Sequence, residues 1–189
     1  NQMLRNCTTT DLTADDIHQI GLDEVARLRT EMEAIKDRVG FSGDLTEFFA
    51  FVASDERFFY GNDENGRQRY LDESTEYIEN MKALLPQYFG ILPKADLVVK
   101  RVEAFREQDG AAAHYFASSP DGSVPGTYYV HLSDMTANPV TELEAVAYHE
   151  GLPGHHMQIA IARELESVPT FRSQAGFGAY AEGWALYTE

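Results

Sequence analysis

The sequence has little that could cross-link the chain or anchor it in a membrane. Its single cysteine, Cys7, has no partner for a disulfide within the chain. No segment approaches the roughly 18 consecutive apolar residues of a membrane-spanning helix, and residues 1–10 lack the apolar centre of a signal peptide. The chain starts without methionine and ends within an apolar, helix-like segment, so we expect a fragment of a longer protein.

Basic residues are also scarce. The 189 residues include 15 lysines and arginines against 31 aspartates and glutamates, which gives a formal net charge of −16. A surface this acidic repels polyanions, so we expect no nucleic-acid partner and no anionic-membrane partner. The hydrophobic fraction of 43% is sufficient for the core of one ordinary domain. The oligomeric state is left open.

Hydrophobic periodicity predicts helices at both ends of the chain and strands in the middle. Helical spacing covers residues 13–35, 45–53 and 67–88 and returns after residue 140, and strands are expected at 97–102, 113–116 and 128–132. We predict one mainly α domain with a small antiparallel β-sheet (α+β). Its parts are a helical region over 1–95, the sheet over 96–133, and helices over 134–189 that carry the cluster described next.

Half of the six histidines fall within eight residues, as His149, His155 and His156, with Glu150 beside the first. Imidazole is the commonest zinc ligand, and glutamate serves as ligand or base. In the zinc-peptidase motif His-Glu-x-x-His, the two histidines lie one helical turn apart. Here proline occupies the position of the second histidine, so this is not that motif.

An unbroken helix would keep these histidines apart, because His149 and His155 would lie about 600° apart around its axis. Pro153 disrupts the helical hydrogen bonds, and Gly154 permits unusual backbone dihedrals. We therefore predict that two extra residues are looped out of a His-Glu-x-x-His arrangement. One helix would end near Glu150 and the next would begin near His155.

A third ligand is expected from Glu182, which lies in the apolar and aromatic run 180–187. A buried carboxylate needs a partner, and a divalent cation is a strong one. Glu189 is the weaker ligand candidate and is expected to orient a ligand instead. Between His155 and His156, the residues alone do not decide the second ligand.

At these residues the chain resembles the bacterial domain-of-unknown-function family 885. The resemblance rests on His-Glu-x-x-Pro-Gly-His-His-x-Gln at 149–158, on Glu-Gly-Trp-Ala-Leu-Tyr at 182–187, and on the segments 13–27, 89–94 and 121–128. It implies a zincin-like, gluzincin-like metallopeptidase core within a larger helical protein that is exported or lipid-anchored. It further implies that His149, His155 and Glu182 bind Zn²⁺ and that Glu150 is the general base.

We therefore expect a zinc-dependent hydrolase of peptide or small amide substrates. The side chains expected to contact substrate are His114, Tyr115, Tyr128, His131 and His156. The strand 127–132 is the candidate sheet edge for the substrate backbone, with Gly126 allowing close approach. A zinc hydrolase of other acyl bonds, or a degenerate module that binds metal or peptide without catalysis, is the alternative. The intact Glu150 favours an enzyme, because a metal store needs no base beside its ligand.

Overall fold

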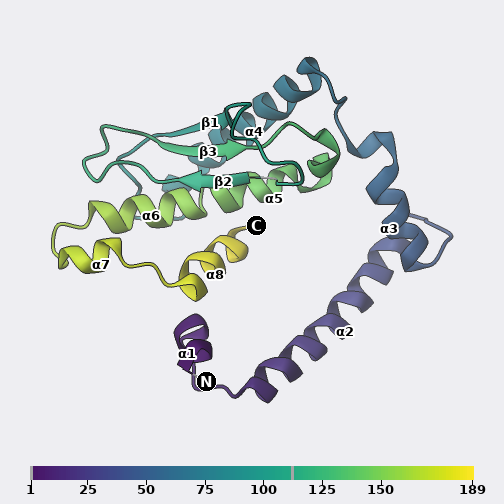
Figure 1. The fold of residues 1–189 in the computed structure, drawn as a ribbon, viewed down its shortest axis with the longest axis horizontal. Coiled ribbons are helices and arrows are strands. Elements are labelled where there is room, and N and C mark those ends of the chain that lie inside the picture. Colours follow the sequence, from purple (N-terminus) through teal and green to yellow (C-terminus); the bar gives the residue numbers. More distant parts are fainter. Residues whose placement is uncertain (1, 112) are drawn as a thin grey trace. The chain divides into compact units, whose positions relative to one another are not determined.

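The chain divides into two compact units, and the boundary along the sequence lies between Phe58 and Phe59. The computed structural model describes residues 2–111 and 113–189 (Figure 1). This boundary falls inside the segment 1–95, so the prediction of one helical region within a single domain is wrong in part. The first unit holds α1 (Gln2–Thr8), α2 (Ala14–Arg38), α3 (Leu45–Ser54) and a 3-10 turn at Glu56–Phe58.

Helix α2 starts where the sequence predicts. The Thr13 hydroxyl accepts a hydrogen bond from the backbone N–H of Asp16, and the Asp16 carboxylate accepts one from the Thr13 backbone, which is a complete capping box. No residue of α2 is buried, and Ile20, Val25 and Leu28 remain exposed. The apolar spacing therefore predicted the helix correctly, although nothing in the first unit buries its apolar side chains.

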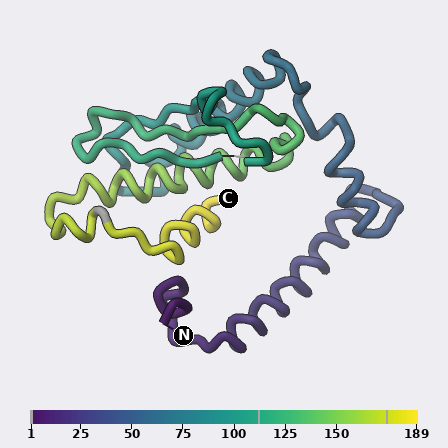
Figure 2. Tube along the Cα trace, viewed as in Figure 1, coloured from purple at the N-terminus to yellow at the C-terminus, as the bar shows by residue number. Residues whose placement is uncertain are grey.

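The second unit combines a long helix, a three-stranded sheet and a series of shorter helices (Figure 2). In chain order these are α4 (Glu64–Leu84), a 3-10 turn (Leu85–Gln87), β1 (Leu97–Arg101), β2 (Ala113–Phe116), β3 (Gly126–Val130), a 3-10 turn (Met135–Ala137), α5 (Val140–Glu150), α6 (His155–Glu164), α7 (Thr170–Gln174) and α8 (Gly178–Thr188). No helix among the described residues has the length and apolar character to cross a membrane.

The sheet is mixed, so the prediction of an antiparallel sheet is wrong in part. Its strand order is β1-β3-β2, with β1 parallel and β2 antiparallel to β3. The chain runs out along β1, returns along β2 one strand away, and then places β3 between them. Strand β3 is therefore central, and the expectation that 127–132 forms a sheet edge is wrong. The edges are β1 and β2.

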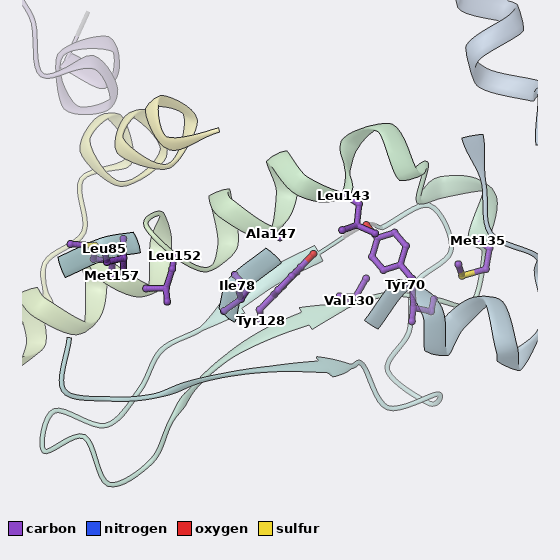
Figure 3. Packing of buried hydrophobic residues seen from close by; sticks show 11 residues of the cluster. Tyr70, Ile78, Leu85, Tyr128, Val130, Met135, Leu143, Ala147, Leu152 and Met157 are labelled. Atoms are coloured by element: carbon purple, nitrogen blue, oxygen red, sulfur yellow. The ribbon is translucent and has the colours of Figure 1, made fainter. Parts of the chain in front are cut away.

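The core lies where β3 meets helices α4, α5 and α6 (Figure 3). Tyr128 and Val130 of β3 are fully buried there, because alternate residues of a strand point to the same face. The partners that bury them come from the three helices and from the segments that flank them, and they are Tyr70, Ile78, Leu85, Leu132, Met135, Leu143, Ala147, Leu152 and Met157. Helices α5 and α6 are thus held against the sheet.

An ion pair between the half-buried Arg101 and the carboxylate of Glu107 fixes the segment that follows β1. The carboxylate of Glu107, only 4% exposed, accepts hydrogen bonds from Nε and Nη2 of Arg101 at 3.0 and 2.8 Å. It also accepts one from the backbone N–H of Leu132 at 2.7 Å. Arg101 and the Leu132 amide lower the pKa of Glu107, and burial opposes them in part.

We expect Glu107→Gln to destabilise the protein by about 2 kcal/mol at neutral pH, because it removes a charge-assisted hydrogen bond. A carboxylate whose pKa is lower in the folded state stabilises the fold above its ordinary pKa of 4.5. That contribution is lost as the pH falls through the folded-state pKa. Urea unfolding at pH 7 and in the acid range should therefore show a difference between wild type and variant that shrinks on acidification. A difference independent of pH would contradict this account.

Candidate metal centre

The two helices that carry the histidine cluster are separated by four residues, 151–154. Helix α5 ends at Glu150 and α6 begins at His155, which confirms the predicted interruption. The backbone N–H of Gly154 donates to the Tyr148 carbonyl at 3.0 Å, which folds the loop back onto the end of α5. A Cβ on Gly154 would lie 2.1 Å from the His149 carbonyl oxygen. Only glycine fits at this position.

This loop brings two imidazoles together. The rings of His149 and His155 lie 4.7 Å apart, centroid to centroid, at an interplanar angle of 84°. Glu182 of α8 completes the group: its Oε2 lies 3.6 Å from Nε2 of His149 and 3.4 Å from Nε2 of His155. One ligand atom from each of the three residues lies within 4.8 Å of the other two. The structure thus brings together the three residues named as metal ligands.

Helix α8 is placed by the aromatic residue two positions after Glu182. The indole Nε1–H of Trp184 donates to the Pro153 carbonyl at 2.8 Å, and the ring packs edge-on against Phe89. The next residue, Ala185, is fully buried. Trp184 therefore fastens α8 to the loop between the histidines, and this contact holds Glu182 over their rings.

The residues present fit a zinc ion in both spacing and protonation. Nδ1 of His149 lies 2.7 Å from Oε1 of Glu189, and because a carboxylate accepts, Nδ1 donates. Nε2 then offers its lone pair toward Glu182, which is the orientation that a carboxylate partner gives to a metal-binding histidine. Four ligands at zinc–nitrogen distances of ~2.0–2.1 Å in a tetrahedron lie about 3.4 Å from one another. The distances of 3.4 and 3.6 Å to Glu182 match that spacing.

Glu150 lies in the same pocket as the three ligand candidates. The pocket has a volume of about 390 Å³, and its walls are Ala113, His114, Tyr115, His149, Glu150, His155, Ile159, Ala181 and Glu182. Burial raises the pKa of Glu150 to about 7; the nearby His149 opposes that shift, and Glu182 adds to it. A carboxyl group with this pKa can both accept and release a proton near neutral pH.

His156 lies outside this cluster. It is 1% exposed, and its Nδ1 accepts a hydrogen bond from Tyr115 Oη at 3.0 Å while Nε2 donates to the Ala95 carbonyl at 3.1 Å. It points away from His155 because successive helical residues differ by about 100°. A Cβ on Gly126 would lie 2.5 Å from Nδ1 of His156, so Gly126 makes room for this contact. The structure therefore places His156 outside the ligand group, and neither His156 nor Gly126 lines the pocket described above.

The other residues expected to contact substrate divide into two groups. His114 and Tyr115 line the pocket. Tyr128 does not, because it is 0% exposed in the core, so its assignment as a substrate contact does not fit the structure. His131 is also buried; its Nδ1 accepts from the backbone N–H of Gln108 at 3.1 Å, and it lies beside His114 in a neighbouring pocket.

Three residues of the pocket wall were not among the predicted site residues: Ala113, Ile159 and Ala181. Ile159 lies four positions after His155, and residues at that spacing share one face of a helix. The four-residue spacing from His155 therefore predicts that Ile159 lies in the pocket, provided that the start of α6 is known.

Comparison with known proteins agrees with the motifs. A family model described as "Bacterial protein of unknown function (DUF885)" matches residues 1–189, so the chain belongs to this family. A crystal structure described as that of "the putative lipoprotein from Colwellia psychrerythraea" has 35% sequence identity and a TM-score of 0.92 over 98% of the chain. The chain spans 32% of the length of that protein. No curated protein matches the chain.

Proposed function

We propose that this chain carries the active site of a zinc-dependent hydrolase of peptide bonds. The observation that supports this most directly is the convergence of His149, His155 and Glu182 in a pocket that also holds Glu150. Three protein ligands with an accessible pocket are typical of catalytic zinc, whereas structural zinc has four. When bound, zinc acts as a Lewis acid and lowers the pKa of a water molecule to about 7.

The role of the chain's own residues follows from their positions. The carboxylate of Glu150 takes a proton from the attacking water and later delivers it to the leaving amine. Glu189 holds Nδ1 of His149 and so keeps Nε2 directed at the ligand group.

The edge strand β2 is suited to hold an extended substrate. Ala113, His114 and Tyr115 of β2 line the pocket, and β2 pairs on one side with β3. Among the described residues no strand pairs with its other side. A peptide that adds a strand there would run past Glu150, with its backbone hydrogen-bonded to β2. The Tyr115 side chain, hydrogen-bonded to His156, fixes the strand against α6.

The similarity to a protein described as a lipoprotein supports an exported or lipid-anchored location for the parent protein. Such a location suits a hydrolase of peptides that arrive from outside the cell.

The proposal is tested by metal content in the purified protein. We expect about one zinc per chain, lost in His149→Ala, His155→Ala and Glu182→Ala. His156→Ala is the matched control, because it removes the imidazole next to His155 and should leave the zinc content unchanged. His156 is buried, so His114→Ala is the control if the His156→Ala protein does not fold. Elemental analysis after dialysis gives the stoichiometry. A folded wild-type protein that takes up no zinc would refute the enzyme and favour the non-catalytic module.

A further inference from the structure

A second pocket adjoins the metal centre. It has a volume of about 620 Å³ and lies between α6, α7 and α8. Ile159 of α6 and Ala181 of α8 line both this pocket and the one that holds Glu150. The two pockets therefore share part of their walls, and a ligand in the second pocket lies next to the metal centre.

The rim of this pocket is aromatic. Phe171, Phe177 and Tyr180 line it, and their exposed fractions are 69%, 59% and 61%. Aromatic side chains that remain this exposed around a hollow are typical of a site that binds an apolar group. Apolar contact alone would not select one kind of substrate.

Two arginines supply the selective element. Arg163 and Arg172 line the pocket, and within residues 2–111 and 113–189 no carboxylate lies within 4.0 Å of either guanidinium. Among the described residues, Arg29, Arg38, Arg67 and Arg69 also lack such a partner. Arg163 and Arg172 are distinguished by their place in a pocket with an aromatic rim. Nη1 of Arg163 donates to the Ser118 carbonyl at 2.9 Å, which fixes the position of its guanidinium. A fixed arginine without a carboxylate partner is suited to bind an incoming carboxylate.

A third polar group in the pocket also has no partner. The side-chain Oε1 of Gln158 is buried, and no hydrogen bond reaches it from the described residues. A buried amide oxygen without a donor is costly unless a ligand supplies one. A peptide N–H is such a donor.

The spacing along α6 connects this pocket to the reaction site. His155, Ile159 and Arg163 follow each other at four-residue intervals and so share one face of the helix. The rise from His155 to Arg163 is about 12 Å, which an extended peptide spans in about four residues. A group bound by Arg163 therefore lies within a few residues of a peptide bond at the metal centre.

We propose that this pocket binds the C-terminal residue of a peptide, with its free carboxylate on Arg163 and Arg172 and its apolar side chain among the aromatic residues. A C-terminal apolar residue supplies both groups at once, whereas an internal acidic residue supplies only the charge. This inference rests on the proposed function, because it names the substrate of the hydrolase. That substrate is a peptide with an apolar C-terminal residue, cleaved a few residues before its C-terminus. The pocket itself contains none of the metal ligands.

The test is calorimetric titration of the zinc-free protein, kept in EDTA so that carboxylates cannot bind metal. Three ligands are compared: N-acetyl-Ala-Ala-Phe, its C-terminal amide, and N-acetyl-Ala-Glu-Phe-amide. We expect the free acid to bind at least about tenfold more tightly than either amide, as for a charge-assisted hydrogen bond. Arg163→Gln and Arg172→Gln should each remove this preference. Lys100→Gln is the matched control, because it removes one exposed positive charge from the opposite sheet edge.

Equal affinities for acid and amide, or no binding of either, would overturn the proposal. An equally tight Glu-containing amide would overturn the assignment to the C-terminus. Arg172 is exposed, so its variant remains informative if Arg163→Gln does not fold. Because binding is measured without zinc, the result is separate from the metal analysis: acid preference without zinc uptake would retain the pocket and reject the hydrolase.

Discussion

Replacing Glu150 with Gln is expected to abolish peptide hydrolysis while zinc remains bound. Glutamine has the same shape but takes no proton at the position of the carboxylate, so the loss should reach about 10²–10⁴-fold. The variant should fold at least as well as wild type, because burial already disfavours the charged form of this side chain and raises its pKa to about 7. Initial rates on a peptide substrate, measured together with zinc content, test both parts.

Glu144→Gln is the matched control for this substitution. Glu144 lies on the same helix, is exposed, and accepts a hydrogen bond from the Tyr148 hydroxyl at 2.9 Å. The control should retain its activity. A fully active Glu150→Gln variant would exclude Glu150 as the base, and loss of zinc from that variant would mean that it acts as a ligand instead.

The part of the site that could be predicted from the sequence is the part set by neighbouring residues. Pro153 and Gly154 disfavour a continuous helix through local backbone effects, so the break between α5 and α6 could be predicted near its observed position. Glu182 could be named as a ligand because it interrupts an apolar run, but the expectation that this run buries it is wrong. Helix α8 leaves the Glu182 side chain 67% exposed. The approach of Glu182 to His149 and His155 depends on how α8 docks, and Trp184 makes the contact that no local pattern encodes.

The parts that could not be predicted depend on long-range pairing. Strands β1 and β2 follow each other in the sequence, but they are not neighbours in the sheet. Hydrophobic alternation identifies a strand without revealing its position in the sheet. The choice of β3 as the edge was wrong for this reason. The residues alone did not decide between His155 and His156 as the second ligand. That choice depends on how α6 is rotated about its axis where it starts after the loop. Gly126 was expected to let a substrate backbone approach the strand, whereas the structure packs it against His156 and Tyr115.

Gly154→Ala is expected to destabilise the second unit strongly. The added Cβ would lie 2.1 Å from the His149 carbonyl oxygen and 2.2 Å from that of Tyr148, both of them backbone atoms. The loop must then move away from the end of α5, at a cost of about 3 kcal/mol, toward the upper end for single substitutions. Urea unfolding measures this loss.

The same displacement should weaken the metal site, because the loop sets the distance between His149 on one helix and His155 on the next. We therefore expect Gly154→Ala to bind zinc more weakly than wild type even where it remains folded, although it alters no ligand. Gly90→Ala is the matched control: nothing lies within 4 Å of its added Cβ, so stability and zinc affinity should stay unchanged. A Gly154→Ala protein with wild-type zinc affinity would show that the ligands converge without the tight turn. The glycine would then serve the fold alone, whereas a parallel loss of stability and affinity means that one close backbone contact supports both.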